Sequence, residues 1–254
     1  AFTTLADWKA SINRLAGFNL AVERAQQQAV GIAVEHGDAG AIVLNGLDLA
    51  LPDGRVLIGD ISGTIQPGER ILISGPSGCG KSTLFRAIAG IWPYGSGAIR
   101  IPREASLMFL PQSSYLPIGT LRSALAYPSG EHDYPDQEIC RYLDLCRLPH
   151  LKDKLDMYAN WGKRLSPGEQ QRLAFARVFL TRPQAVFLDE ASSAMDGETE
   201  EILYALLQQE LPQATIVSIA HRETVARYHS RRWHFSRSGN AAGDDVSRLS
   251  IAPL

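Results

Sequence analysis

Apolar positions along the chain change their spacing near residue 40. Before that point they recur every three or four residues, the pattern of an amphipathic helix with a narrow apolar stripe, at Leu5, Trp8, Ile12, Leu15, Phe18, Val22 and Ala25. Small residues over 31–40 then indicate a linker. The helix either packs on its own domain or is the end of another domain, such as a helix that descends from a membrane part.

Short β-type runs with turn signals follow from residue 41. The runs 41–44, 56–58 and 61–65 are separated by turns that contain Pro and Gly, which predicts antiparallel hairpins. The near-continuous apolar run 70–74 predicts a strand covered on both faces. Further strands are expected over 107–110, 185–188, 215–219 and 232–235, and helices over 84–89, 199–209 and most of 120–180. Because strands alternate with helices, we expect an α/β fold with a mainly parallel core sheet.

Composition removes several classes of protein. Lys plus Arg number 25 and Asp plus Glu 27, so the net charge is −2, which argues against a surface built to bind nucleic acid. Three cysteines are too few for a disulfide scaffold and favour a reducing cytosol. No apolar run approaches the roughly 18 residues that span a bilayer.

A glycine-rich motif lies between a predicted strand and a predicted helix. Residues 75–83, Gly-Pro-Ser-Gly-Cys-Gly-Lys-Ser-Thr, match the phosphate-binding pattern G-x-x-x-x-G-K-[ST]. Its glycines let the backbone wrap an anion, and its amides point inward at a helix N-terminus. Lys81 is expected on the β/γ-phosphates and Ser82 on Mg²⁺. The nucleotide-binding residues of this P-loop are expected to be Gly75, Ser77, Gly78, Cys79, Gly80, Lys81, Ser82 and Thr83.

The same loop contains a cysteine that we expect to be reactive. Cys79 is followed two residues later by Lys81, at the N-terminus of the predicted helix. Such positions favour the thiolate form of a cysteine. Alkylation of Cys79 is therefore expected to block nucleotide binding.

Two adjacent carboxylates end the predicted strand 185–188. Asp189 is expected to hold Mg²⁺ directly or through water, because α/β sheets bind ligands at the carboxyl ends of their strands. Glu190, on the opposite side of the strand's alternation, is expected to face the γ-phosphate and orient a water molecule. Such a pair is also common as a helix cap, but the P-loop in the same chain favours the functional interpretation.

The segment 165–172, Leu-Ser-Pro-Gly-Glu-Gln-Gln-Arg, predicts the start of a helix. Ser166 and Glu169 form a capping box, and Pro167 suits the first helical position. A helix start exposes free backbone amides, which can bind a phosphate.

Taken in order, these motifs resemble the ATP-binding domain of ABC transporters over about residues 41–235. The P-loop, segment 165–170, Asp189-Glu190, segment 192–196 and His221 occur in the order typical of that family, and Gln112 resembles its glutamine loop. The resemblance implies a P-loop NTPase fold with an antiparallel β subdomain and a helical signature subdomain. It also implies ATP and Mg²⁺ as ligands, and a sandwich homodimer in which the signature of one subunit closes on the γ-phosphate held by the other.

The resemblance also assigns roles to residues. Glu190, Gln112 and His221 would be catalytic, with Gln112 contacting Mg²⁺ and water and His221 contacting the γ-phosphate. The expected metal-binding residues are Ser82, Gln112 and Asp189. The nucleotide contacts expected outside the P-loop are Ser166, Gly168, Glu169 and Asp196.

Finer features resemble the peroxisomal fatty-acyl transporter subfamily and its bacterial half-transporter relatives. These features are the segment 84–93, Glu169, and Arg222 directly after His221. The resemblance implies a native chain that is longer at its N-terminus, with a transmembrane domain in the same chain, at the cytoplasmic face of the bacterial inner membrane. The expected partners are that domain and a second copy of the ATPase domain, and no nucleic acid. The expected division is a helix and linker over 1–37, the ATP-binding domain over 38–238 with a helical subdomain over about 113–180, and a loose tail over 239–254.

Two departures from the family pattern affect the expected site. Pro167 stands where the family usually has Gly, which removes one backbone donor. No aromatic residue lies between Phe18 and Phe85, and Leu51 and Pro52 are found where many members stack adenine.

Two other functions remain as alternatives. A soluble ABC protein of DNA repair or translation would need long coiled coils or two ATPase domains, respectively. A non-hydrolysing regulatory module would not need Glu190 and His221.

Overall fold

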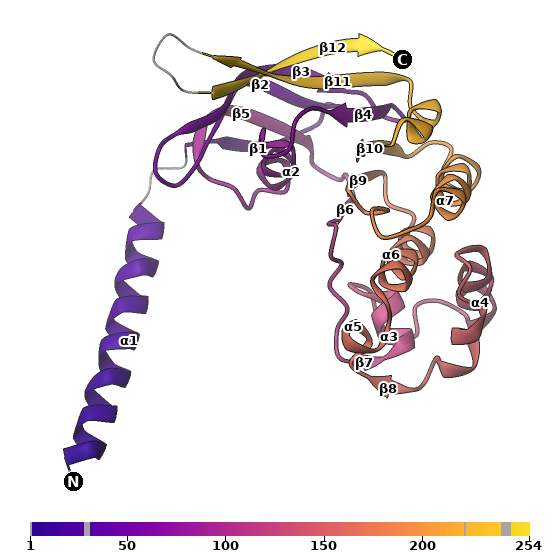
Figure 1. Ribbon diagram of the computed structural model, residues 1–254, viewed down its shortest axis with the longest axis horizontal. Helices are drawn as coiled ribbons and strands as arrows, with labels where there is room; N and C mark the ends of the chain where they lie inside the picture. The colour runs from indigo at the N-terminus through magenta and orange to yellow at the C-terminus, as the bar shows by residue number, and fades with distance from the viewer. Residues whose placement is uncertain (1, 28–30, 221, 240–244) are drawn as a thin grey trace.

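The structure, a computed structural model, describes residues 2–27, 31–220, 222–239 and 245–254. A ten-stranded sheet of order β1-β5-β2-β3-β12-β11-β4-β10-β9-β6 forms its body (Figure 1). The strands are β1 (Ala33–Gly37), β2 (Ile42–Ala50), β3 (Val56–Ile65), β4 (Arg70–Ser74), β5 (Gly95–Pro102), β6 (Leu107–Leu110), β9 (Ala185–Asp189), β10 (Thr215–Ile219), β11 (Arg231–Gly239) and β12 (Asp245–Pro253). A separate small sheet pairs β7 (Gly119–Thr120) with β8 (Tyr158–Ala159).

Helices and 3₁₀ turns complete the fold. They are α1 (Phe2–Gln27), α2 (Lys81–Ile88), α3 (Leu121–Ala126), α4 (Asp136–Leu145), η1 (Pro149–Lys154), α5 (Trp161–Arg164), α6 (Pro167–Thr181), α7 (Gly197–Glu210) and η2 (Glu223–Tyr228). The mixed α/β fold with its mainly parallel core sheet confirms the fold class expected from the sequence.

The parallel core of the sheet consists of β11, β4, β10, β9 and β6. Successive side chains of a strand point to opposite faces, so a strand covered on both faces is apolar throughout. In β9, Phe187 packs with Phe85 of α2, with ring centroids 5.2 Å apart. Val186 and Leu188 instead belong to the apolar cluster of α6 and α7. The sheet is therefore held between α2 on one face and helices α6 and α7 on the other.

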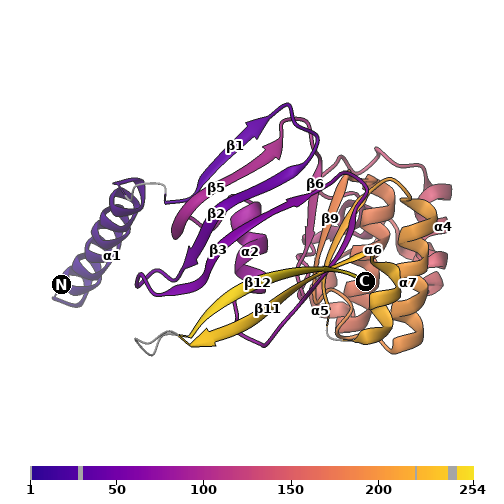
Figure 2. The ribbon, with the colours of Figure 1, turned by 90° about the horizontal axis from the view of Figure 1, so that it is seen from above.

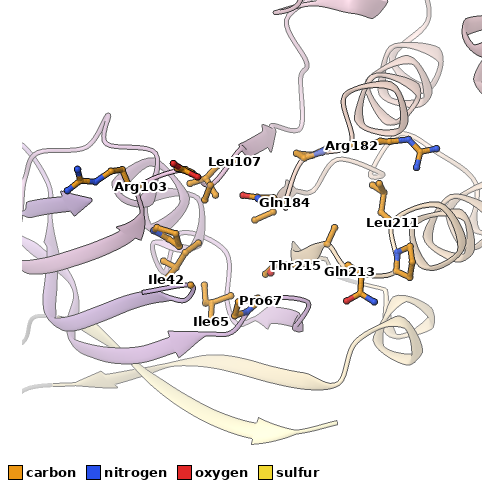
Figure 3. A pocket seen from close by; sticks show the side chains of 18 of the residues that line it. Ile42, Ile65, Pro67, Arg103, Leu107, Arg182, Gln184, Leu211, Gln213 and Thr215 are labelled. Carbon is orange, nitrogen blue, oxygen red and sulfur yellow. The ribbon is translucent and has the colours of Figure 1, made fainter. Parts of the chain in front are cut away.

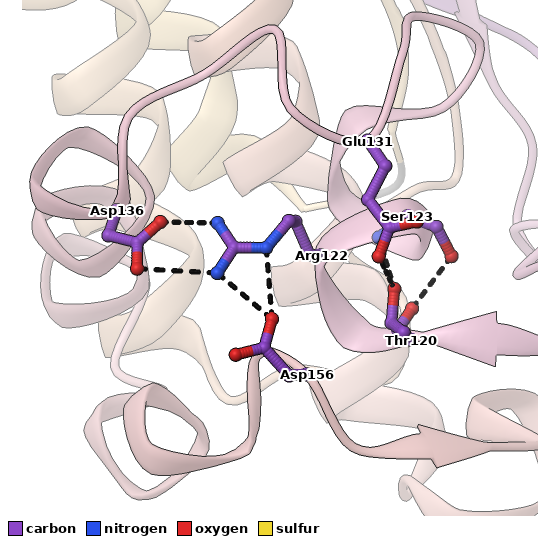
Figure 4. A network of polar contacts seen from close by, with 6 residues as sticks. All are labelled: Thr120, Arg122, Ser123, Glu131, Asp136 and Asp156. Atoms are coloured by element: carbon purple, nitrogen blue, oxygen red, sulfur yellow. Dashed lines mark hydrogen bonds and ion pairs between the residues drawn. The ribbon is translucent and has the colours of Figure 1, made fainter.

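A buried arginine holds the helical lobe, residues 119–181, together (Figure 4). Arg122, with a side chain only 7% exposed, bonds to the carboxylates of Asp136 at the start of α4 and Asp156 before β8. Its Nε and Nη2 donate to Asp156 at 3.1 and 3.0 Å. Its hydrogen bond keeps the pKa of Asp136 below the usual value. Thr120 caps α3 by accepting the Ser123 amide at 3.0 Å.

The N-terminal helix α1 projects away from the sheet in both views (Figures 1 and 2). Its predicted apolar stripe is uncovered, since Trp8 and Phe18 are each 67% exposed. Within residues 2–27, 31–220, 222–239 and 245–254 the structure offers no helix with the length and apolarity of a membrane span. The helix predicted from periodicity is therefore present, but its apolar face has no partner among the described residues.

The expected linker and the expected loose tail both contribute strands. Residues 33–37 form β1, which pairs in parallel with β5. Residues 245–253 form β12, which pairs over nine positions with β11 and touches β3 at Ser247. Neither segment carries a strong apolar pattern, and each lies in the sheet through its ladder with β5 or β11. The expected loose tail is thus a strand over residues 245–253, whereas the division of the chain at 37 and 239 stays a prediction.

Candidate functional site

The P-loop joins β4 to α2 and forms a glycine-lined cradle. Gly75, Gly78 and Gly80 have φ of 143°, 74° and 100°, which residues with a side chain rarely adopt. A Cβ on Gly80 would lie 2.7 Å from Ile58, so glycine is also required for space. Lys81 reaches back across the loop, and its Nζ donates to the carbonyls of Gly75 and Pro76 at 2.9 and 2.8 Å. The glycines and the Lys81 ammonium thus lie together in one loop, and their contacts with a nucleotide stay a prediction.

Ser82, in the first turn of α2, meets the carboxylate that ends β9. Its Oγ donates to Asp189 Oδ1 at 2.9 Å. Burial raises the pKa of Asp189, because desolvation disfavours the charged form, and the Ser82 hydroxyl partly opposes this shift. A cation at this position would stabilise the carboxylate.

This hydroxyl–carboxylate pair fits Mg²⁺. The ion usually takes one or two protein oxygens and completes its coordination with phosphates and water. Across the described residues no three His, Cys, Asp or Glu side chains form a metal cluster. Ser82 and Asp189 supply two oxygen atoms of the kind that Mg²⁺ takes from proteins.

Glu190 follows Asp189 at a sharp change of chain direction. Its φ of 50° lies in the left-handed region, which is uncommon for a residue with a side chain and is found often at functional sites. Its amide donates to the carbonyl of Ile219, the last residue of β10, at 3.1 Å. The backbone of Glu190 is thus anchored to the strand beside β9.

The structure describes Gln112 but not His221. The register Leu110↔Leu188 between β6 and β9 places Gln112 at the same sheet edge as Glu190. The Gln112 carbonyl accepts from Gln171 of α6 at 3.0 Å. His221 lies outside the described residues, so its role stays a prediction.

The capping box at the start of α6 is confirmed. Ser166 Oγ accepts from the Glu169 amide at 3.4 Å, and Glu169 Oε2 accepts from the Ser166 amide and hydroxyl at 2.9 and 2.7 Å. These bonds lower the pKa of Glu169, and His150, whose Nε2 lies 2.9 Å from Oε1, adds to the effect. Glu169 is therefore occupied in shaping the helix start.

A hollow of about 410 Å³ opens beside this helix start and contains Ser166, Gly168 and Asp196. Asp196 caps α7, accepting the Thr199 amide at 2.8 Å and hydroxyl at 2.9 Å, which lowers its pKa. No residue of the described P-loop lines this hollow. The structure thus brings Lys81, Ser82 and Asp189 together, but it does not bring the signature residues to them within one chain.

Three residues that sequence reasoning did not assign lie around the site. From α6, Gln171 donates to the Gln112 carbonyl in the loop after β6 and accepts the Ala194 amide in the loop after β9. Arg237 of β11 donates to the Ser77 carbonyl of the P-loop at 3.0 Å. Arg222 donates to Glu200 and to the Met195 carbonyl at 3.1 and 2.9 Å, which anchors the position next to His221. The sequence contains no local signal for these contacts, because each joins distant segments.

Cys79 differs from the expectation of a reactive thiol. Although it belongs to the P-loop, it is only 2% exposed, and Lys81 Nζ lies 3.9 Å from its Sγ. Alkylating reagents need access to the sulfur, so the structure argues against rapid modification of this residue. Cys140 is the more accessible of the three cysteines.

Leu51 and Pro52, which are found where many members of the family stack adenine, share a hollow with an aromatic residue. Leu51 and Pro52 line a hollow of about 430 Å³ together with Tyr94. Trp92 donates from Nε1 to the Ala50 carbonyl at 2.9 Å, and its ring meets that of Tyr94 edge-on at 5.4 Å. The fold therefore brings Tyr94 beside the aliphatic pair.

A third hollow, of about 840 Å³, lies at the other end of the parallel strands (Figure 3). Leu107, Ala185 and Thr215 line it, and these are the first residues of β6, β9 and β10. Parallel sheets bind nucleotides at the carboxyl ends of their strands. This hollow is therefore separate from the nucleotide motifs.

Comparison with known proteins agrees with this geometry. The model of the family described as ABC transporter matches residues 58–193. An uncharacterized ABC transporter ATP-binding protein of Haemophilus influenzae is 41% identical over 218 residues, which cover 86% of this chain and 36% of the relative. ATP-binding cassette sub-family D member 3 of Mus musculus is 36% identical over 200 residues, 76% of this chain and 30% of that protein. These relatives confirm the resemblance seen in the sequence.

Solved structures agree on the fold. The structure of a bacterial Atm1-family ABC exporter with ATP bound superposes with a TM-score of 0.73 at 23% identity, covering 93% of this chain and 44% of that one. This chain thus spans less than half the length of each of these matched proteins. It belongs to the ABC transporter family and matches the ATP-binding domain of that family.

Proposed function

We propose that this chain binds and hydrolyses Mg²⁺–ATP as one half of a nucleotide-sandwich dimer, and that the reaction powers transport across a membrane. The observation that carries the proposal is the Ser82–Asp189 pair, 2.9 Å apart, beside a glycine-lined loop that contains Lys81. These groups match the charges of a metal–triphosphate. Glu190 follows directly in the chain and supplies a carboxylate for water.

The role of each residue in the reaction follows from its position in the site. Lys81, now on two P-loop carbonyls, would exchange them for the β/γ-phosphate oxygens and offset their charge. Ser82 and Asp189 would hold Mg²⁺, which supplies positive charge to the phosphates as the terminal one leaves. Glu190 would accept a hydrogen bond from the attacking water and orient it. Gln112 and His221 would support that water and the γ-phosphate.

The second half of the site would come from another copy of the chain. Ser166 and Gly168 line a hollow that contains no P-loop residue, so one chain alone leaves the γ-phosphate without a signature contact. In the dimer the Gly168 amide and the Ser166 hydroxyl would close on the phosphate of the partner. Pro167 supplies no amide there.

The proposed transport role rests on the uncovered helix α1 and on the size of the relatives. Exposed apolar side chains on α1, such as Trp8 and Phe18, are typical of a surface that a partner covers. The chain covers only 36% and 30% of two matched relatives. We propose that a transmembrane domain precedes α1, and that the ATPase domain lies at the cytoplasmic face of that membrane.

Phosphate release from Mg²⁺–ATP by the chain tests the proposal. We expect steady release that orthovanadate inhibits and that EDTA abolishes. Lys81→Met should abolish it, because the cradle loses the cation that faces the phosphates. Tight ATP binding without release would instead indicate a regulatory module.

A further inference from the structure

We propose that Gln171 is the positioning residue that couples the two nucleotide sites of the dimer, an inference that rests on the function proposed above. Gln171 lies in the second turn of α6 and is only 3% exposed. Among the hydrogen bonds of its side chain, one goes to a residue expected in the nucleotide site, and that partner is the backbone carbonyl of Gln112. Its effect on the reaction must therefore pass through other segments.

The side-chain amide of Gln171 both donates and accepts hydrogen bonds. Its Nε2 donates to the Gln112 carbonyl at 3.0 Å and to Ser193 Oγ at 3.2 Å. Its Oε1 accepts the backbone amide of Ala194 at 2.9 Å. One side chain thus joins α6 to the loop after β6 and to the loop after β9.

Both of these loops lead to the subunit's own nucleotide. Ser193 is bound through its amide to the Glu190 carbonyl at 3.0 Å. Gln112 lies at the sheet edge beside Glu190. A shift of either residue when the γ-phosphate binds or leaves would be transmitted to Gln171.

The helix that carries Gln171 serves the other nucleotide. Ser166 and Gly168 begin α6, and in the dimer they act on the partner's phosphate. A Cβ on Gly168 would lie 3.0 Å from the Ala194 carbonyl, so the signature also packs closely on the loop that Gln171 binds. The loop that leads to the subunit's own nucleotide is therefore packed directly against the signature residues, which act on the partner's nucleotide.

Burial makes this connection selective. A buried amide that loses its partners leaves unsatisfied groups, which is costly, so the two loops and α6 are favoured in one mutual arrangement. Coupling between sites requires an element whose position both sites bias. The contacts of Gln171 meet that requirement, since the subunit's own nucleotide biases the loops after β6 and β9 and the partner's nucleotide biases the start of α6.

The neighbouring glutamine provides a matched control. Gln170 Nε2 donates to the carbonyls of Gly162 and Leu165 at 2.9 and 2.8 Å. These partners lie just before α6, and the bonds reach neither loop. Replacing each glutamine with methionine keeps the length of the side chain and removes its hydrogen bonds. A general effect on the helix would appear in both variants, whereas loss of coupling would appear only in Gln171→Met.

The experiment measures ATP hydrolysis by the full 254-residue chain against ATP concentration, together with ATP binding in EDTA and thermal unfolding. We expect a Hill coefficient above one for the unmodified chain and for Gln170→Met. For Gln171→Met we expect a coefficient near one, the loss of a coupling of about tenfold in ATP affinity between the two sites, together with a lower kcat. Affinity for ATP in EDTA should not change, because the P-loop is untouched.

Gln171→Glu is the conservative variant. Its carboxylate still accepts the Ala194 amide but cannot donate to the Gln112 carbonyl. We expect a Hill coefficient between those of the unmodified chain and Gln171→Met.

Each outcome bears on a different statement. A chain that hydrolyses ATP cooperatively and is unaffected by Gln171→Met would overturn the coupling role alone. Parallel loss of thermal stability and of ATP affinity in EDTA would show a merely structural residue and would also overturn it. Absence of hydrolysis by the unmodified chain would contradict the proposed function, and the inference would fail with it.

Discussion

The Ser82 hydroxyl donates a hydrogen bond to the Asp189 carboxylate across 2.9 Å, although 107 positions separate the two residues. Ser82 lies in the first turn of α2, which follows β4. Asp189 ends β9, and β10 lies between those two strands. All three strands run in parallel, so their carboxyl ends meet at one edge of the sheet. This edge is where the P-loop, the acidic pair and Gln112 converge.

Removing the Ser82 hydroxyl should weaken binding only when magnesium is present. Ser82→Ala takes one oxygen from the metal and leaves the Asp189 carboxylate without its donor. A hydrogen bond to a charged group contributes about 1.5–3 kcal/mol, so affinity for Mg²⁺–ATP should fall roughly tenfold or more. Calorimetric titration with and without EDTA measures the difference.

Ser74→Ala is the control for this effect. Ser74 ends β4 just before the P-loop, and its hydroxyl pairs with His234 Nδ1 at 3.0 Å, away from Asp189. We expect no change in the magnesium dependence of this variant. Equal magnesium dependence in Ser82→Ala and the unmodified chain would show that the hydroxyl does not bind the ion.

Glu190→Gln should bind ATP but hydrolyse it very slowly. A positioned general base contributes about 10²–10⁴-fold, and the amide cannot serve as one. The change also removes repulsion from the γ-phosphate, which at about 4 Å and an effective dielectric of 20 is on the order of 4 kcal/mol before screening. The variant should therefore accumulate as an ATP-bound dimer in size-exclusion chromatography with light scattering.

Two further substitutions identify what holds that dimer. Adding Ser166→Arg should abolish it, because the larger side chain blocks the partner's phosphate. Should Glu190→Gln stay monomeric at high ATP, Pro167→Gly in the same background separates the causes. Restored dimerisation would show that the proline weakens the signature, whereas a persistent monomer would show that closure needs the membrane part.

His229 should make the fold sensitive to acid. It is buried, its Nδ1 contacts the Val225 carbonyl at 2.9 Å and its Nε2 contacts Ser218 Oγ at 2.9 Å. Because the carbonyl only accepts, neutral His229 donates from Nδ1 and accepts at Nε2. Burial lowers the pKa of His229 from the usual 6.5 to about 4.

The direction of the pH effect follows from this lowered pKa. Between pH 6.5 and 4 the unfolded chain binds the extra proton and the folded chain does not, so stability is fully present above 6.5 and is lost as the pH falls through this window. The loss attributable to His229 is about 3 kcal/mol. Urea unfolding of the chain and of His229→Gln at several pH values measures it. If both lose stability equally between pH 6.5 and 4, His229 is not the cause.

An aromatic ring at position 51 should improve base binding. Stacking of a base on an aromatic ring contributes about 1–3 kcal/mol, so Leu51→Tyr should raise ATP affinity by roughly tenfold. The unmodified chain should bind ATP and GTP with similar affinity. Competition titration with both nucleotides checks this.

Tyr94→Leu completes the comparison at the base site. Tyr94 shares a hollow with Leu51 and Pro52, so it is the nearby ring that the fold offers. Reduced ATP affinity in Tyr94→Leu would show that this ring takes part in base binding. Strong selectivity for ATP in the unmodified chain, unaffected by Tyr94→Leu, would contradict the expectation of weak base recognition.

Much of the central fold was predictable from local patterns. The strands Leu107–Leu110 and Thr215–Ile219 have the predicted bounds, because continuous apolar runs between turn residues suit strands covered on both faces. The helix start at Ser166 was predictable because a capping box is a contact within four residues. The P-loop was predictable because its glycines are required by the backbone itself.

Tertiary structure alone decided the contacts between distant segments. The pairing of β12 with β11 gave a strand to a tail with little apolar pattern, the burial of Cys79 removed an expected reactive thiol, and Gln171 received partners from two loops. The sequence determined the local geometry and the chemical groups of this protein, because backbone preferences and apolar periodicity act over a few residues. Hydrogen-bond partners and solvent access depend on which segments the folded sheet brings together, and so only the tertiary structure decided them.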